Sequence, residues 1–102
     1  MGARQGIVPV IDGKLVSVVD TSTDSTTVYT GDGVIDGIYV NTALSAHTVV
    51  IKDGTTAMFT LPASLAAGTL IDFGGVEFLT SLVVDPDNSS TGSISVIYRP
   101  YN

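Results

Sequence analysis

The sequence predicts an all-β domain, and three observations lead to that fold class. Val, Ile, Thr, Ser and Gly are abundant while charged residues make up only 14% of the chain, a composition that favours strands. Short apolar runs recur along the whole chain, and most of them are closed by a turn that contains Gly, Asp or Asn. Apolar residues almost never recur at helical spacing. Together these patterns are typical of an antiparallel β-sandwich or barrel.

The length of the chain predicts one domain. A chain of 102 residues is the size of a single compact domain with one hydrophobic core. Residues 1–6 contain no apolar run, and they are predicted to form a flexible N-terminal arm that orders only against a partner. Residues 7–102 are predicted to form the β domain.

Turn dipeptides divide this domain into strands. Asp12-Gly13 and Asp53-Gly54 each suit a two-residue hairpin, and Gly74-Gly75 is expected to join two further strands. Gly37 lies inside a strand and is expected to mark a bulge or a close approach by another backbone. The predicted strands are 7–11, 14–20, 26–30, 34–41, 47–52, 55–61, 70–73, 76–80, 82–85 and 93–99.

The second half of the chain adds three expectations. The unbroken apolar run in 82–85 predicts a strand that is buried on both faces. The final strand alternates, which places Ile94, Val96 and Tyr98 on one face, and Pro100 is expected to end its pairing. Residues 62–68 are rich in Ala and Leu and end in Gly, so they predict one short helical turn.

The charge balance excludes several classes of partner. A formal charge of −6 repels the phosphates of nucleic acids and anionic lipid surfaces.

No segment approaches the length of a membrane span, and residues 1–6 lack the apolar core of a signal peptide, so we expect a soluble protein that is not exported by that route. With no cysteine, the chain offers no disulfide, thiolate nucleophile or sulfur-ligated metal.

The residues that could carry chemistry lack partners at the right spacing. His47 is the single histidine, and no second ligand lies at metal-site spacing from it. Asp85, Asp87 and Ser89 resemble the start of a calcium loop, but Ser90 and Val96 occupy the positions where Gly and Glu are required. We therefore predict no catalytic residues, no cofactor and no metal. An enzyme with paired carboxylates is disfavoured because almost all the acids lie in turn contexts.

Three stretches of the sequence, residues 38–49, 51–54 and 82–86, carry a resemblance to a known class of protein. They resemble small virion proteins of tailed bacteriophages, either capsid decoration (cement) proteins or head-spike proteins. The resemblance implies a jelly-roll-like β-sandwich that binds the outside of an icosahedral capsid in many copies. It also implies a homo-oligomer at a symmetry axis, with a trimer favoured over a dimer, and it brings no catalytic residues.

These considerations predict a structural virion protein on the capsid surface, made in the host cytoplasm, whose partner is the major capsid protein. Neither nucleic acid nor membrane is expected to be bound. The termini are the expected contact regions, and the predicted partner-binding residues are Arg4, Gln5, Arg99, Tyr101 and Asn102. The alternative is a carbohydrate- or receptor-binding tip module of a head fibre or spike, in which Tyr98, Tyr101 and the turn at 85–88 would meet a sugar.

Overall fold

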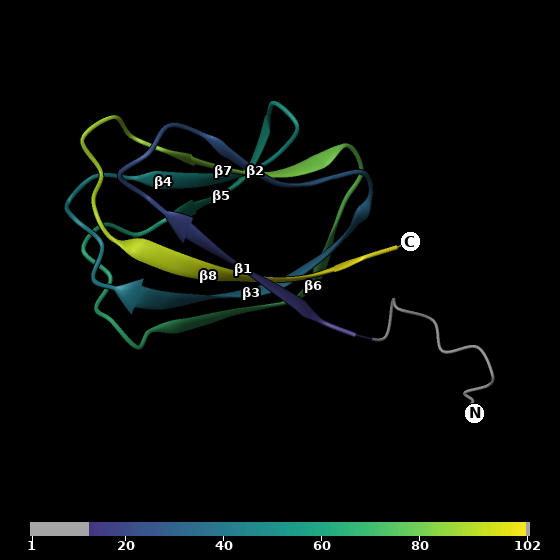
Figure 1. Cartoon of the computed structure of the whole chain (residues 1–102), viewed down its shortest axis with the longest axis horizontal. Helices are drawn as coiled ribbons and strands as arrows, with labels where there is room; N and C mark the ends of the chain where they lie inside the picture. Colours follow the sequence, from purple (N-terminus) through teal and green to yellow (C-terminus); the bar gives the residue numbers. More distant parts are fainter. Residues whose placement is uncertain (1–12, 102) are drawn as a thin grey trace.

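The computed structural model describes residues 13–101 and shows a β-sandwich. Two four-stranded antiparallel sheets pack face to face (Figure 1), as the composition and the turn spacing predict. No helix occurs within residues 13–101. The strands are β1 (Leu15–Asp20), β2 (Thr26–Thr30), β3 (Gly33–Thr42), β4 (Val49–Asp53), β5 (Thr56–Leu61), β6 (Leu70–Phe78), β7 (Ser81–Pro86) and β8 (Ser93–Pro100).

The connectivity is that of a jelly roll. One sheet has the order β1-β8-β3-β6 and the other has the order β2-β7-β4-β5. Strand β1 therefore pairs with β8, β2 with β7, β3 with β6 and β4 with β5. The first half of the chain runs antiparallel to the second half, and this long hairpin is rolled into two layers. The jelly-roll-like sandwich expected from the resemblance is confirmed.

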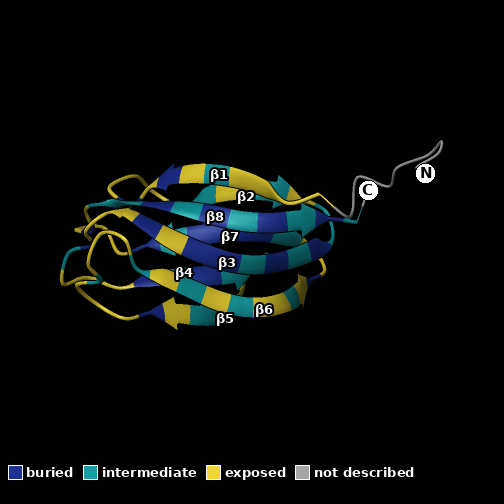
Figure 2. Cartoon of the chain, turned by 90° about the horizontal axis from the view of Figure 1, so that it is seen from below, coloured by how far each residue is buried: buried dark blue, intermediate teal, exposed yellow. Residues whose placement is uncertain are grey.

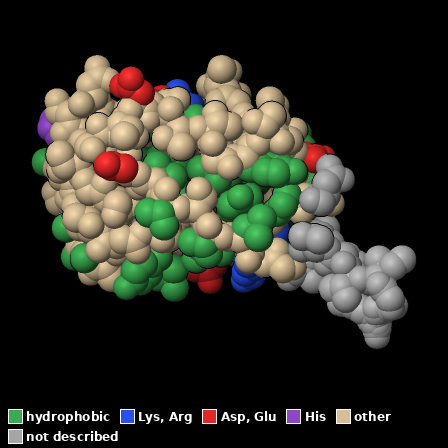
Figure 3. Space-filling view, in the orientation of Figure 1, with side chains coloured by type: hydrophobic (Ala, Val, Ile, Leu, Met, Phe, Trp, Pro, Cys, Tyr) green, Lys and Arg blue, Asp and Glu red, His purple; other side chains and the backbone are tan. Residues whose placement is uncertain are grey.

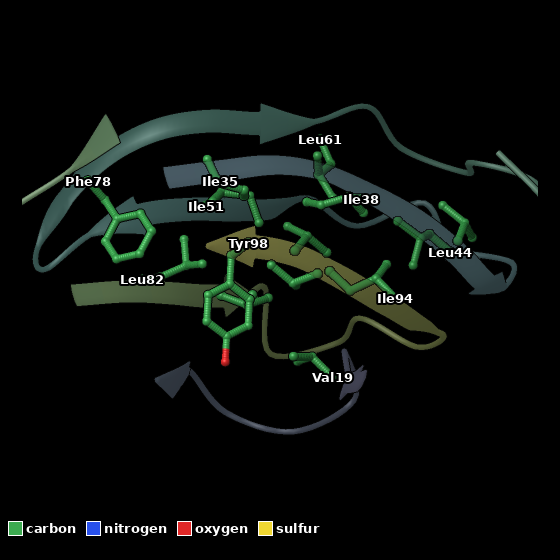
Figure 4. Packing of buried hydrophobic residues seen from close by; sticks show 14 residues of the cluster. Val19, Ile35, Ile38, Leu44, Ile51, Leu61, Phe78, Leu82, Ile94 and Tyr98 are labelled. Carbon is green, nitrogen blue, oxygen red and sulfur yellow. The ribbon is translucent and has the colours of Figure 1, made fainter. Parts of the chain in front are cut away.

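The core fills the space between the two sheets. Apolar residues from both layers point toward one another in Figure 4, among them Ile38 and Ile94 from one sheet and Ile51 and Leu82 from the other, all 0% exposed. Figure 2 shows buried positions alternating with more exposed ones along β3 and β8. The alternation arises because successive residues of a strand point to opposite faces of the sheet.

Strands β7 and β8 follow their sequence patterns closely. In β7, Leu82, Val83 and Val84 are 0%, 8% and 0% exposed, so this strand is buried on both faces as predicted. In β8, Ile94, Val96 and Tyr98 all face the core. Pro100 is itself paired, opposite Gly33, so β8 ends one residue later than the predicted end at Arg99.

The β4–β5 hairpin is confirmed, with its turn one residue later than the sequence indicates. Asp53 still pairs with Thr56, so the two-residue loop is Gly54-Thr55 rather than Asp53-Gly54. Gly54 has a φ of +62°, in the left-handed region that glycine adopts without a steric cost. Asp53 can stay in the strand because the glycine alone supplies this conformation.

The prediction that Gly74-Gly75 joins two strands is wrong. Strand β6 continues through both glycines, since it pairs with β3 before and after them. Ile35 lies opposite Val76 and Gly37 lies opposite Asp72, so Asp36 alone faces residues 73–75. The predicted strand 76–80 accordingly ends at Phe78. Positive φ angles of 71° and 88° at the two glycines let the extra residues form a bulge in place of a turn.

The helical turn predicted at 62–68 is also wrong, because long-range backbone hydrogen bonds replace local ones. The amide of Ser64 donates to the carbonyl of Ser45, and the amide of Leu44 donates to the carbonyl of Leu65, both at 2.9 Å. Ser64 itself has a φ of +61°, which no right-handed helix contains. Such a short segment lacks the local hydrogen bonds to compete with these contacts.

Gly37 is both a bulge and a close approach, as the sequence predicts. The β3 register shifts between Ile35 and Gly37. A Cβ at Gly37 would lie 2.7 Å from the carbonyl oxygen of Ile71 on β6. The structure describes only one strand of the hairpin predicted at Asp12-Gly13. Strand β1 lies within the predicted strand 14–20. The predicted strand 7–11 and the predicted arm 1–6 lie outside the described residues.

Candidate partner-binding face

The solvent-facing side of the β1-β8-β3-β6 sheet carries exposed apolar side chains, and we refer to it as the outer face. Val16 and Val18 on β1 are 61% and 68% exposed, while Tyr39 on β3 and Leu70 on β6 are 42% and 61% exposed. Cross-strand register places Val18 opposite Ser95, which in turn lies opposite Tyr39. Figure 2 looks onto this face, with β1, β8, β3 and β6 in front, and exposed positions occur on β1, β3 and β6. Figure 3 views the edge of the sandwich that β1 crosses in Figure 1, and hydrophobic side chains are visible there.

A shallow hollow lies in the middle of the outer face, over the bulge. It has a volume of about 150 Å³, and Gly37, which has no side chain, is one of the residues that line it. Pockets that bind drug-sized ligands measure roughly 300 to 1,000 Å³, so this hollow is closer in size to a single side chain than to such a ligand. The residues that line it are Lys14, Asp36, Gly37, Leu70, Ile71, Asp72 and Ile97.

Arg99 stands beside this hollow and is held by an ion pair within the chain. Its Nε lies 2.8 Å from Oδ2 of Asp36, and its second contact runs from Nη2 to Oδ1 at 3.1 Å. The side chains of Arg99 and Asp36 are 32% and 13% exposed. Two parallel hydrogen bonds of this kind fix geometry as well as charge, so Arg99 orders the bulged residue Asp36 and exposes only part of its guanidinium.

Tyr101 is the second predicted contact residue that the structure describes. Its hydroxyl donates a hydrogen bond to Oε2 of Glu77 at 2.7 Å, and its amide donates to the carbonyl of Asp32 at 3.2 Å. The hydrogen bond to Glu77 raises the pKa of the Tyr101 hydroxyl. Arg99 and Tyr101 thus lie near one another at the end of β8. Arg4, Gln5 and Asn102 lie outside the described residues.

One anchoring carboxylate was not anticipated from the sequence. Asp53 accepts backbone hydrogen bonds from Leu79 and Thr80 at 2.8 Å each and from Ser81 at 3.3 Å. The bond from the Leu79 amide is the largest cause of the lowered pKa of Asp53. The sequence shows Asp53 only as a turn residue, and a contact between residues so distant in the chain leaves no local pattern.

The residues considered for metal binding are used in turns and ion pairs. Nδ1 of His47 lies 3.6 Å from Oδ1 of Asp87, and that oxygen also accepts the amide of Ser89 at 3.0 Å. Asp85 pairs with Lys52 at 2.6 Å. In the described part of the chain no three His, Cys, Asp or Glu side chains lie close enough together to hold a metal ion.

The residues named for sugar binding are not brought together. Tyr98 is only 8% exposed, and its ring packs 6.0 Å from that of Tyr29. Tyr101 contacts Asp32, near the start of β7, whereas the turn at 85–88 follows the opposite end of that strand. A strand of this length spans about 17 to 20 Å, so these three elements do not form one site.

Comparisons with protein-family models, curated proteins and solved structures find no match to this chain. None of the residues from 13 to 101 belongs to a helix that could cross a membrane.

Proposed function

We propose that this protein is a structural virion component that self-associates and coats the outer surface of a phage capsid, with the major capsid protein as its partner. The observation that carries the proposal is the band of exposed apolar side chains on the outer face, at Val16, Val18, Tyr39 and Leu70. Exposed apolar side chains that gather on one face are more typical of a protein contact than single scattered ones. Tyr39 lies directly opposite Leu70, and Ser95 alone separates Tyr39 from Val18.

The stretches that resemble phage decoration and spike proteins support the fold within this proposal. Residues 38–49 contain Ile38, Val40, Leu44 and Val49, which are all buried in the core. In residues 82–86, the apolar positions of β7 are also buried. These residues pack the core of the sandwich, so the resemblance concerns the fold. The proposed binding surface consists of other residues, which are exposed.

Repetition on a lattice gives such a surface its strength. A small face with a hollow of about 150 Å³ makes a weak contact when only one copy binds. Association between copies makes further binding events effectively intramolecular, so the total affinity rises without any new contact. The arm 1–6 with Arg4 and Gln5, and the C-terminal residues Arg99, Tyr101 and Asn102, are proposed as additional contacts. No catalytic step, cofactor or metal is part of the proposal.

The proposal is tested by mixing the purified protein with undecorated capsids and sedimenting them. We expect the protein to co-sediment in a fixed ratio to the major capsid protein and to saturate. Leu70→Asp places a charge on the outer face and should weaken co-sedimentation. Leu79→Asp is the matched control, because Leu79 is similarly exposed, at 67% against 61%, but lies in the β6–β7 turn.

Two outcomes would contradict the proposal. One is a protein that stays in the supernatant at every ratio of protein to capsid. The other is equal loss of binding in both leucine variants, which would mean that added charge rather than the outer face decides the interaction. A glycan array on the same preparation addresses the tip-module alternative, which predicts sugar binding in place of capsid binding.

A further inference from the structure

We propose that β1 pairs in antiparallel fashion with β1 of a second copy, across a twofold axis at Ser17, so that the two β1-β8-β3-β6 sheets become one continuous sheet. This inference deepens the self-association that the proposed function includes, by naming its site. It rests on the position of β1, on the exposure of its side chains and on the match of the strand with its own reverse.

Strand β1 lies at the edge of its sheet. Strand β8 pairs with one side of it, and no other strand among residues 13–101 pairs with it. The other side is where the hairpin predicted at Asp12-Gly13 would place residues 7–11, so that hairpin and the pairing proposed here exclude one another. Edge strands present backbone N–H and C=O groups that can pair with another chain, and proteins commonly protect such edges with charges, prolines or bulges. Strand β1 has none of these in its centre, where Val16 and Val18 are 61% and 68% exposed.

The sequence around β1 is complementary to itself in one register. Antiparallel pairing with Ser17 opposite Ser17 of the second copy places Val16 opposite Val18 and Lys14 opposite Asp20, each twice because of the twofold symmetry. The four valines then form one apolar cluster on the outer face. The two oppositely charged pairs flank this cluster and favour the same alignment.

The neighbouring registers lack this match. A continuous sheet keeps residues of the same face opposite one another, so the axis can shift along β1 only in whole residues. An axis at Val16 would place Val18 opposite Lys14 of the second copy, and an axis at Val18 would place Val16 opposite Asp20. Each of these registers sets a valine against a charge and removes both ion pairs.

The inner face of β1 fits the same register. Leu15 shares that face with Val19, yet it is 42% exposed while Val19 is 2% exposed. In the proposed pairing Leu15 lies opposite Val19 of the second copy, which covers the exposed end of β1.

A twofold contact closes on two copies, so this inference favours a dimer over the trimer that the resemblance implies. Tyr39 and Leu70 remain on the outer face of each copy for the capsid.

The first test exchanges the two charges. Lys14→Asp puts like charges opposite one another at both ends of the pairing and should raise the dimer dissociation constant roughly tenfold in sedimentation equilibrium. The double variant Lys14→Asp with Asp20→Lys restores opposite charges and should recover most of the affinity. Val16→Lys should abolish the dimer, whereas Leu79→Lys, at a similarly exposed site outside β1, should not.

A second test reads the register directly, and it is possible because the chain has no cysteine of its own. Val16→Cys and Val18→Cys proteins are prepared separately and then mixed under mild oxidation. Directly opposite Cβ atoms lie about 4.5 to 5.5 Å apart and diagonal ones about 7 to 8 Å, so only the first approach what a disulfide needs. The mixture should therefore cross-link several-fold faster than either variant alone.

Several results would overturn the pairing: a wild-type protein that stays monomeric up to millimolar concentration, a trimer, a dimer unaffected by Val16→Lys, or a double variant as weak as the single one. These measurements use the full chain without capsids. A failed dimer with intact capsid co-sedimentation therefore refutes the β1 pairing alone. A stable dimer that ignores capsids refutes the proposed function and leaves the pairing standing.

Discussion

Strands β1 and β7 have similar sequences and opposite surroundings. Each contains three or more β-branched or leucine residues in close succession, Leu-Val-Ser-Val-Val in β1 and Leu-Val-Val in β7. In β7 the three apolar residues are at most 8% exposed, whereas in β1 Leu15, Val16 and Val18 are 42%, 61% and 68% exposed. The difference follows from position, because β7 has a neighbour on both sides, whereas within residues 13–101 β1 pairs with β8 alone.

This comparison shows how the same apolar pattern serves two purposes. In the centre of a sheet an apolar strand contributes to folding stability through burial within the chain. At an edge the same pattern leaves apolar surface that only another molecule can cover. The apolar residues of β7 therefore stabilise the fold, whereas we expect the outward-facing valines of β1 to contribute to binding.

The largest expected effect is a contrast between two leucine truncations. Leu82→Ala in β7 should lower the free energy of unfolding by about 2 to 5 kcal/mol, because it opens a cavity in the core. Leu15→Ala in β1 should cost about 1 kcal/mol or less, since Leu15 is 42% exposed. Urea unfolding at low protein concentration measures both. Equal losses would show that β1 contributes to the core as β7 does.

A smaller loss of stability is expected at Gly37, where the backbones of β3 and β6 approach closely. Gly37→Ala brings a Cβ to 2.7 Å from the Ile71 carbonyl and should cost about 1 to 3 kcal/mol through overpacking. Val16→Leu enlarges an exposed β1 side chain and should be close to neutral in the same unfolding experiment. If Gly37→Ala were as stable as the wild type, the close approach of β3 and β6 would not require a glycine at this position.

The turn that leads into β7 should show a further, pH-dependent effect. Asp53→Asn removes the charged acceptor for the Leu79, Thr80 and Ser81 amides and should cost about 1 kcal/mol, because the carboxylate is partly solvated. The pKa of Asp53 is lowered from its ordinary value of 3.8, so its charge stabilises the fold above that value. This contribution is lost as the pH falls through the lowered pKa.

Unfolding curves of wild type and Asp53→Asn at several pH values check this prediction. The difference between the two proteins should be constant near neutrality and shrink in acid. If the difference in unfolding free energy stayed the same throughout the acid range, the cost of Asp53→Asn would come from the changed shape of the side chain and not from the lost charge. Asp24→Asn is a suitable control, since the carboxylate of Asp24 lies in the exposed loop between β1 and β2.

The smallest expected effect on stability is at β1 itself. Val18→Thr keeps the shape of an exposed side chain and should change the unfolding free energy of the monomer by no more than about 0.5 kcal/mol. The same variant should weaken association, because the hydroxyl would be placed among the valines of the proposed contact. A large loss of monomer stability would instead show that Val18 supports the fold within one chain.

The sequence predicts the sandwich well because its strands carry strong local patterns. The alternation in β8, the apolar run in β7 and the Gly37 bulge could all be anticipated from neighbouring residues. The continuity of β6 through Gly74-Gly75 could not, because pairing with β3 on both sides of the glycines is a tertiary effect. The conformation of residues 62–68 could not be anticipated for the same reason, since backbone hydrogen bonds join this segment to distant residues.

The candidate site was only partly predictable. The sequence indicates Arg99 and Tyr101 as contact residues only through their position, and the structure gives them partners within the fold, Asp36 and Glu77. The apolar run in β1 was visible in the sequence, but its exposure depends on the strand being at an edge. Strand order arises from the topology of the whole chain, so no local pattern identifies an edge strand.

The most direct test of this account is amide hydrogen exchange of β1 and β7 in wild-type protein at increasing concentration. Amides in β7 are bonded to β2 and β4 within one chain, so their exchange should not depend on concentration. Amides of β1 that face away from β8 should become protected as the second copy binds. Exchange in β1 that is independent of concentration would contradict the account, because no second copy would then cover the strand.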